Sequence, residues 1–135
     1  MRCLVAVDDP SVRDTVAHAA TNFGGIEVDA VAVEECRRQI RRRRYDFGLV
    51  ALKFGSKDSM EFWEKIRSSA PNLPLVGLTS ASAVDGYKGD RSRLQLFALL
   101  GVPLDVVDLY RTLRRLIDRV KRSPAEKQRP VDGPA

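Results

Sequence analysis

The chain has 135 residues, of which 44% are hydrophobic and 30% charged, and its net charge at pH 7 is +5. This length suits one domain with a buried core, and the composition excludes a disordered or membrane-spanning class, because no apolar run approaches the roughly 20 residues that cross a bilayer. We therefore expect one folded domain over residues 1–122, followed by a disordered tail or linker over residues 123–135, which hold three prolines and show no periodicity.

The first half of the chain alternates short apolar runs with helical patterns. The run Cys3–Val7 is typical of a buried parallel strand, and it is too short for a signal-peptide core, which predicts a cytoplasmic protein. The Asp-Asp-Pro-Ser stretch after it opens a helix that ends at the glycine pair Gly24-Gly25. The pattern then predicts a strand over 26–33, a helix over 34–44 and a strand over 47–52.

The second half repeats this alternation. A helix is predicted over 59–69, the fourth strand over 75–79 and the fifth over 96–100. Residues 80–93 contain two glycines and no apolar stripe, so a loop or a frayed helix is expected there. The last helix begins after Pro103 and is strongly amphipathic. Five strands that alternate with helices predict an α/β fold with a doubly wound, five-stranded parallel sheet.

Five residues end the predicted strands or follow them, at the edge where ligands of such sheets bind. They are Asp8, Asp9, Ala51, Thr79 and Val102. Forming an acyl phosphate needs a carboxylate nucleophile, a divalent cation and usually a cationic side chain. Ala51 and Val102 supply neither the nucleophile nor the cationic side chain, so we expect no enzyme activity. The two aspartates could hold Mg²⁺ weakly through water, or Asp9 or Ser11 could cap the first helix.

The segment from Tyr45 to Phe62 resembles the third strand, phosphorylation loop and third helix of bacterial response-regulator receiver domains, and the resemblance extends over residues 2–122. It implies a flavodoxin-like (βα)5 fold. In that family an acidic pair binds Mg²⁺ beside a phosphoacceptor aspartate, and a hydroxyl residue contacts the phosphoryl group. Asp8 and Asp9 match the acidic pair, and Thr79 matches the hydroxyl residue.

Three of the family's six functional positions are lost. Ala51 replaces the phosphoacceptor, Val102 replaces the phosphate-binding lysine, and Leu99 replaces the switching aromatic residue, whereas the following Pro103 is present. The resemblance therefore predicts a degenerate receiver, or pseudo-receiver, of two-component or phosphorelay signalling. It would require no cofactor and act by protein contact without phosphorylation. A small-molecule-sensing receiver and an atypically phosphorylated receiver are the alternatives.

Arginine is concentrated in the second predicted helix. Six arginines lie within residues 37–44, and without them the net charge of +5 would become −1. A helical projection places the solvated side of this helix at Arg38, Arg41 and Arg42. A solvated helix end is the simpler explanation of these residues, and a surface for an anionic partner is the functional one. Direct nucleic-acid binding is not expected, because neither a reading helix nor interleaved aromatic residues are found.

The last helix supplies another candidate surface. Receivers commonly bind partners with the fourth helix, fifth strand and fifth helix, so the resemblance implies a protein partner on this face. The polar side of the last helix carries Arg111, Arg114, Arg115, Asp108 and Asp118. A homodimer through this helix is an alternative arrangement, and no segment predicts contact with a membrane.

Overall fold

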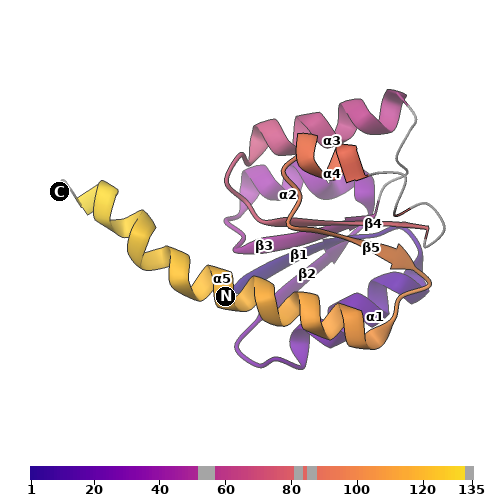
Figure 1. The fold of residues 1–135 in the computed structure, drawn as a ribbon, viewed down its shortest axis with the longest axis horizontal. Coiled ribbons are helices and arrows are strands. Elements are labelled where there is room, and N and C mark those ends of the chain that lie inside the picture. The colour runs from indigo at the N-terminus through magenta and orange to yellow at the C-terminus, as the bar shows by residue number, and fades with distance from the viewer. Residues whose placement is uncertain (52–56, 81–83, 85–87, 133–135) are drawn as a thin grey trace.

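A five-stranded parallel sheet forms the centre of the molecule. The structure, a computed structural model, describes residues 1–51, 57–80, 84 and 88–132. The strands pair in the order β2-β1-β3-β4-β5 (Figure 1). They are β1 (Arg2–Ala6), β2 (Glu27–Val31), β3 (Phe47–Ala51), β4 (Leu75–Ser80) and β5 (Ala98–Val102). The predicted α/β fold with a doubly wound, flavodoxin-like sheet is confirmed.

Helices cover both faces of this sheet. On one face lie α1 (Pro10–Thr21) and α5 (Val106–Asp132) (Figure 1). On the other face lie α2 (Cys36–Arg42), α3 (Lys57–Ser69) and α4 (Lys88–Arg93), and a short 3-10 turn, η1 (Val33–Glu35), leads into α2. None of the helices in the described ranges combines the length and the apolarity that a bilayer crossing needs.

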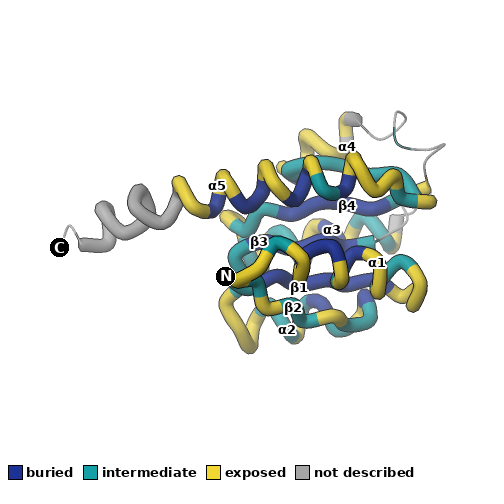
Figure 2. Tube along the Cα trace, turned by 90° about the horizontal axis from the view of Figure 1, so that it is seen from below, coloured by how far each residue is buried: buried dark blue, intermediate teal, exposed yellow. Residues whose placement is uncertain are grey.

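Alternation along the strands divides the core between the two faces. In β1, Cys3 and Val5 pack toward α1 and α5, whereas Leu4 and Ala6 pack toward α2 and α3. The central strands are therefore apolar on both sides and buried, while the edge strand β2 is partly exposed (Figure 2). This explains why the central strands read as continuous apolar runs in the sequence.

Gly48, in the middle of β3, lies where the neighbouring strands pack closely. A Cβ atom at Gly48 would lie 3.1 Å from Cδ2 of Leu75 and 3.4 Å from the carbonyl oxygen of Leu4. The two cysteines, Cys3 and Cys36, are buried free thiols. Burial raises the pKa of the Cys36 thiol to about 12, and it also raises the pKa of Cys3.

Several predicted boundaries differ from the structure. The fifth strand is Ala98–Val102, shifted by two residues from the predicted 96–100. Leu96 is buried before the strand begins, so the apolar run alone does not reveal where pairing with β4 starts. The second strand, Glu27–Val31, is shorter than the predicted 26–33, because Val33 already belongs to η1. Such differences at element ends arise because an apolar pattern marks burial and not hydrogen bonding.

The sequence pattern predicts irregular structure in two further segments. Residues 80–93 lie partly outside the described residues, but Lys88–Arg93 forms α4. Residues 123–132 continue α5 as a helix where the sequence pattern predicts a disordered tail or linker (Figure 1). Pro124 and Pro130 lie within this stretch, and neither can donate the backbone hydrogen bond of a helix interior. The domain boundary after residue 122 is not tested by this observation and stays a prediction.

Candidate functional site

Strand register brings the predicted pocket residues to one edge of the sheet. Ala51 ends β3 and pairs with Leu78, which directly precedes Thr79 in β4. Val102 ends β5 and pairs with Ser80 at the end of β4. The positions expected for phosphoacceptor, hydroxyl residue and lysine thus lie at the carboxyl ends of three neighbouring strands. This is the edge at which doubly wound folds bind ligands.

The acidic pair at the end of β1 is hydrogen-bonded to backbone groups. Oδ1 of Asp9 accepts hydrogen bonds from the backbone N–H groups of Ser11, at 2.9 Å, and Val12, at 3.2 Å. These bonds cap α1. Oδ1 of Asp8 accepts a hydrogen bond of 2.9 Å from the backbone N–H of Val33, where η1 begins. Each aspartate therefore orients a neighbouring helical segment.

The residues at this edge suit a tightly held magnesium ion poorly. Mg²⁺ prefers octahedral oxygen ligands and usually takes one or two carboxylates. Asp8 and Asp9 provide carboxylates, but each has an oxygen bonded to a backbone N–H, and the side chain of Ala51 provides no oxygen. Within the described ranges, no group of three or more His, Cys, Asp or Glu side chains is placed to hold a metal ion. Weak, water-mediated binding stays the expectation for Mg²⁺.

Apolar side chains occupy the positions at which the resemblance places the reactive groups. Ala51 and Val102 are partly buried and pack against the core formed with α1 and α5. Leu99 points to the other face of β5 and packs against the core formed with α2 and α3. The peptide bond between Val102 and Pro103 is cis. A methyl and an isopropyl group at this edge can neither attack a phosphoryl donor nor neutralise its charge.

The sequence analysis missed one cation near this edge. The guanidinium of Arg13, in the first turn of α1, donates a hydrogen bond of 3.4 Å to the carbonyl oxygen of Val7. Its half-buried side chain is thereby held at the end of β1, beside the start of the acidic pair. The four-residue spacing from the helix cap Asp9 was the available signal, because it places the side chain one turn after the cap.

Arginines of the second helix are separated by the structure. Arg38 pairs with Glu35 at 3.2 Å, and Arg42 lines a hollow beside β2. Arg41 lines a different groove, between α2 and α3. The predicted residues Arg38, Arg41 and Arg42 are all exposed, but their side chains belong to different parts of the surface.

The arginines of α5 also diverge. The guanidinium of Arg115 lies over the Phe97 ring, 6.0 Å from its centroid, on the side of α5 that meets β5. Arg114 instead lines a hollow beside the turn between α1 and β2. Arg111 lies 3.6 Å from Asp108 on the same helix. Of the three predicted arginines of α5, Arg115 is therefore the one that its contacts place beside β5.

Comparison with known proteins gives distant relatives. No model of a known protein family matches the chain. The chain is 23% identical over 126 residues to the transcriptional regulatory protein GlrR of Escherichia coli K12, and equally to QseF of E. coli O157:H7. Each alignment covers 93% of this chain but 28% of the relative. The chain thus spans little more than a quarter of the length of these relatives.

Solved structures share its architecture. The REC domain of AraT, a response regulator from Geobacillus stearothermophilus, superposes with a TM-score of 0.77 and 23% identity, over 91% of this chain and 97% of that one. A CheY-like receiver domain protein from Methanospirillum hungatei gives a TM-score of 0.74 at 20% identity, over 90% and 97%. The chain therefore has the flavodoxin-like fold of receiver domains.

Proposed function

We propose that this chain is a receiver-type signalling domain that accepts no phosphoryl group and acts by binding another protein. The observation that carries the proposal is Ala51, a methyl group at the end of β3 where a phosphoacceptor would need a carboxylate. The receiver fold and the distant similarity to transcriptional regulatory proteins support a role in two-component or phosphorelay signalling. Such a domain needs no cofactor, catalyses no reaction and belongs in the cytoplasm.

Loss of phosphorylation follows from three changes that act together. Ala51 removes the nucleophile, and Val102 removes the cation that would stabilise the developing charge. The acidic pair keeps its carboxylates but engages one oxygen of each with the backbone. Thr79 is then a hydroxyl residue without a phosphoryl group to contact. Regulation would come from partner binding, expression level or an attached domain.

The proposed partner surface is the face formed by α4, β5 and α5. There Arg115 and Arg119 both lie over the Phe97 ring, and Arg91 donates a hydrogen bond of 3.1 Å to the Phe97 carbonyl oxygen. This arrangement concentrates positive charge around an aromatic ring, which suits an acidic protein surface. A second copy of the chain, bound through α5, is the alternative occupant of this face.

NMR titration of the ¹⁵N-labelled chain tests the proposal. Mg²⁺ is added first and beryllofluoride second, while the amide signals of Asp8, Asp9, Ala51 and Thr79 are followed. We expect Mg²⁺ to move only signals near the acidic pair, and beryllofluoride to add nothing, because position 51 holds no carboxylate to bind it. Shifts that spread from Thr79 to α5 would contradict the proposal.

The variant Ala51→Asp/Val102→Lys is the matched control. It restores the nucleophile and the cation in the same fold, so we expect it to respond to beryllofluoride and to incorporate phosphate from acetyl phosphate. Incorporation of hydroxylamine-sensitive phosphate by the unmodified chain would instead establish an atypical phosphorylation site. A response by the variant alone would mean that Ala51 and Val102 are the reason why the pocket does not react.

A further inference from the structure

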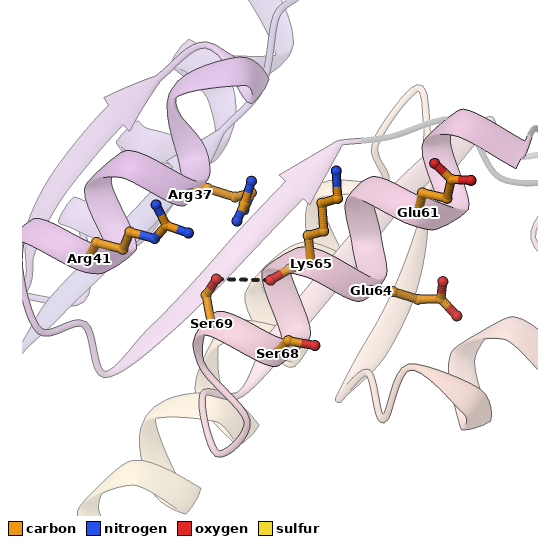
Figure 3. A pocket seen from close by; sticks show the side chains of 7 residues that line it. All are labelled: Arg37, Arg41, Glu61, Glu64, Lys65, Ser68 and Ser69. Carbon is orange, nitrogen blue, oxygen red and sulfur yellow. Dashed lines mark hydrogen bonds between the residues drawn. The ribbon is translucent and has the colours of Figure 1, made fainter.

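A groove between α2 and α3 lies on the face of the sheet opposite α1 and α5. Its volume is about 430 Å³. The side chains that line it come from the two helices (Figure 3) and are Arg37, Arg41, Glu61, Glu64, Lys65, Ser68 and Ser69. This groove is distinct from the sheet edge that holds Ala51 and from the face formed by α4, β5 and α5.

Positive charge in the groove is not neutralised from within the described structure. Arg37 and Arg41 are one turn apart on α2, and Lys65 comes from α3 across the groove (Figure 3). Among the described residues, no carboxylate lies within ion-pairing distance of these three side chains. In contrast, Arg38 and Arg43 of the same region pair with Glu35 and Asp29. The groove therefore holds three cations for which the described residues supply no ion pair: two from α2 and one from α3.

One donor in the groove is buried without a hydrogen-bond acceptor. Nε of Arg37 is inaccessible to solvent, and no acceptor is within hydrogen-bonding distance in the part of the chain that the structure describes. A buried donor without a partner destabilises the protein by about 1–3 kcal/mol, so such groups usually have a ligand or a water as partner. Because Nε has no exposed surface, a ligand oxygen bonds to it only if the Arg37 side chain moves.

The side chains of the groove favour carboxylates as ligands. Guanidinium groups bind carboxylates and phosphates through paired hydrogen bonds, and Lys65 adds a single charge. Oγ of Ser69 donates its proton to the carbonyl oxygen of Lys65 at 2.9 Å, so it can only accept a hydrogen bond from a ligand. An acceptor beside three cations suits a ligand that carries both carboxylates and N–H groups, as a peptide does.

The carboxylates on α3 make a protein segment a better ligand for this groove than a nucleic acid. Glu61 and Glu64 line the same groove, and Figure 3 shows Glu64 extending from the side of α3 that faces away from α2. A phosphate backbone laid along the groove would bring its charges against these glutamates. A protein segment can place acidic residues between the cations and a basic residue beside the glutamates, so its charges match along the whole groove.

We propose that this groove docks a segment of a partner protein, with glutamate or aspartate between Arg37, Arg41 and Lys65 and with lysine or arginine toward Glu64. This inference extends the proposed function, because it names a second contact surface and the chemistry of its partner. It differs from the solvated face of Arg38, Arg41 and Arg42, of which only Arg41 belongs to the groove.

The test is an NMR titration with a short synthetic peptide in which adjacent glutamates are followed by lysines. We expect saturable shifts of the α2 and α3 amides and of the Nε–Hε signal of Arg37. The variant Arg37→Gln/Arg41→Gln should weaken binding by about tenfold or more. Its matched control, Arg38→Gln/Arg42→Gln, removes the same charge and should change the affinity by less than about twofold.

Several outcomes would overturn the inference. Equal weakening by both double variants would mean that net charge alone attracts the peptide. The same α2 and α3 shifts with inorganic phosphate or a DNA duplex would show that the groove binds phosphate groups. The absence of shifts at millimolar peptide would show that the groove does not bind such a peptide. Lys65→Gln, at an exposed position, repeats the test in case the half-buried Arg37 is needed for folding. None of these results changes the outcome of the beryllofluoride titration.

Discussion

Asp9 satisfies two backbone N–H groups that the first turn of α1 would otherwise leave without partners. In the receiver pattern the same residue belongs to a metal-binding pair. The two roles predict different measurements, because a helix cap stabilises the fold in the absence of metal. At the residue scale, the function of this site can therefore be separated from its structural role.

We expect Asp9→Ala to lower the free energy of unfolding by about 1 kcal/mol, whether or not Mg²⁺ is present. Asp9→Ser should retain most of the stability, because serine also caps helices. Urea denaturation with and without Mg²⁺ measures both effects, with Asp14→Ala as the control for an exposed carboxylate on the same helix. A loss confined to Mg²⁺-containing buffer would instead identify Asp9 as a metal ligand.

Arg67 acts at the scale of elements, because it connects the end of α3 to two other segments. Its guanidinium donates hydrogen bonds to the carbonyl oxygens of Leu94, at 3.0 Å, and Leu73, at 2.8 Å. It also reaches the carbonyl oxygens of Ala70, Pro71 and Gln95. Burial lowers the pKa of Arg67. All three nitrogens of its guanidinium nevertheless donate hydrogen bonds to these carbonyl oxygens. The segments that precede β4 and β5 are thus held to α3.

We expect Arg67→Lys to lower the free energy of unfolding by about 2 kcal/mol, because a single ammonium cannot reach both segments at once. Hydrogen exchange at residues 94–97 should accelerate more than exchange in β1. The guanidinium of Arg91 makes one hydrogen bond, to the carbonyl oxygen of Phe97, so Arg91→Lys should lower the free energy of unfolding by less. Equal effects of the two substitutions would show that the hydrogen bonds of Arg67 are replaced by water without loss.

At the scale of the molecule, α5 is both a wall of the core and an extension beyond it. Leu109, Leu113, Leu116, Ile117 and Val120 are buried in the core beside α1. The helix continues to Asp132, where it projects past the sheet (Figure 1).

We expect a chain that ends at residue 122 to unfold at the same urea midpoint as the full chain, because Val120 is the last residue of α5 known to be buried. A chain that ends at residue 116 loses Ile117 and Val120 and should unfold at a clearly lower concentration, since each buried side chain contributes about 1.5–3 kcal/mol. A lower midpoint for the first truncation would show that residues 123–132 stabilise the domain.

Much of the candidate site could be located from the sequence, because strand ends are also chain positions. Ala51 lies at the end of the predicted third strand and Val102 just after the predicted fifth, and in a parallel sheet such ends meet at one edge. The surface to which each arginine belongs depends on contacts between segments. A helical projection shows that Arg38, Arg41 and Arg42 are exposed, but the groove partner Lys65 lies on another helix. Likewise, Arg13 gains its position from a carbonyl oxygen on β1.

The sequence by itself determined the order of strands and helices, the two-sided burial of the central strands and the absence of a carboxylate at position 51. These properties follow from the local chemistry and spacing of residues along one chain. The tertiary structure decided which carboxylate oxygens bind backbone groups, where β5 begins to pair, and which cations face one another across α2 and α3. Those properties depend on distances between segments far apart in sequence, and a one-dimensional pattern carries no such distance.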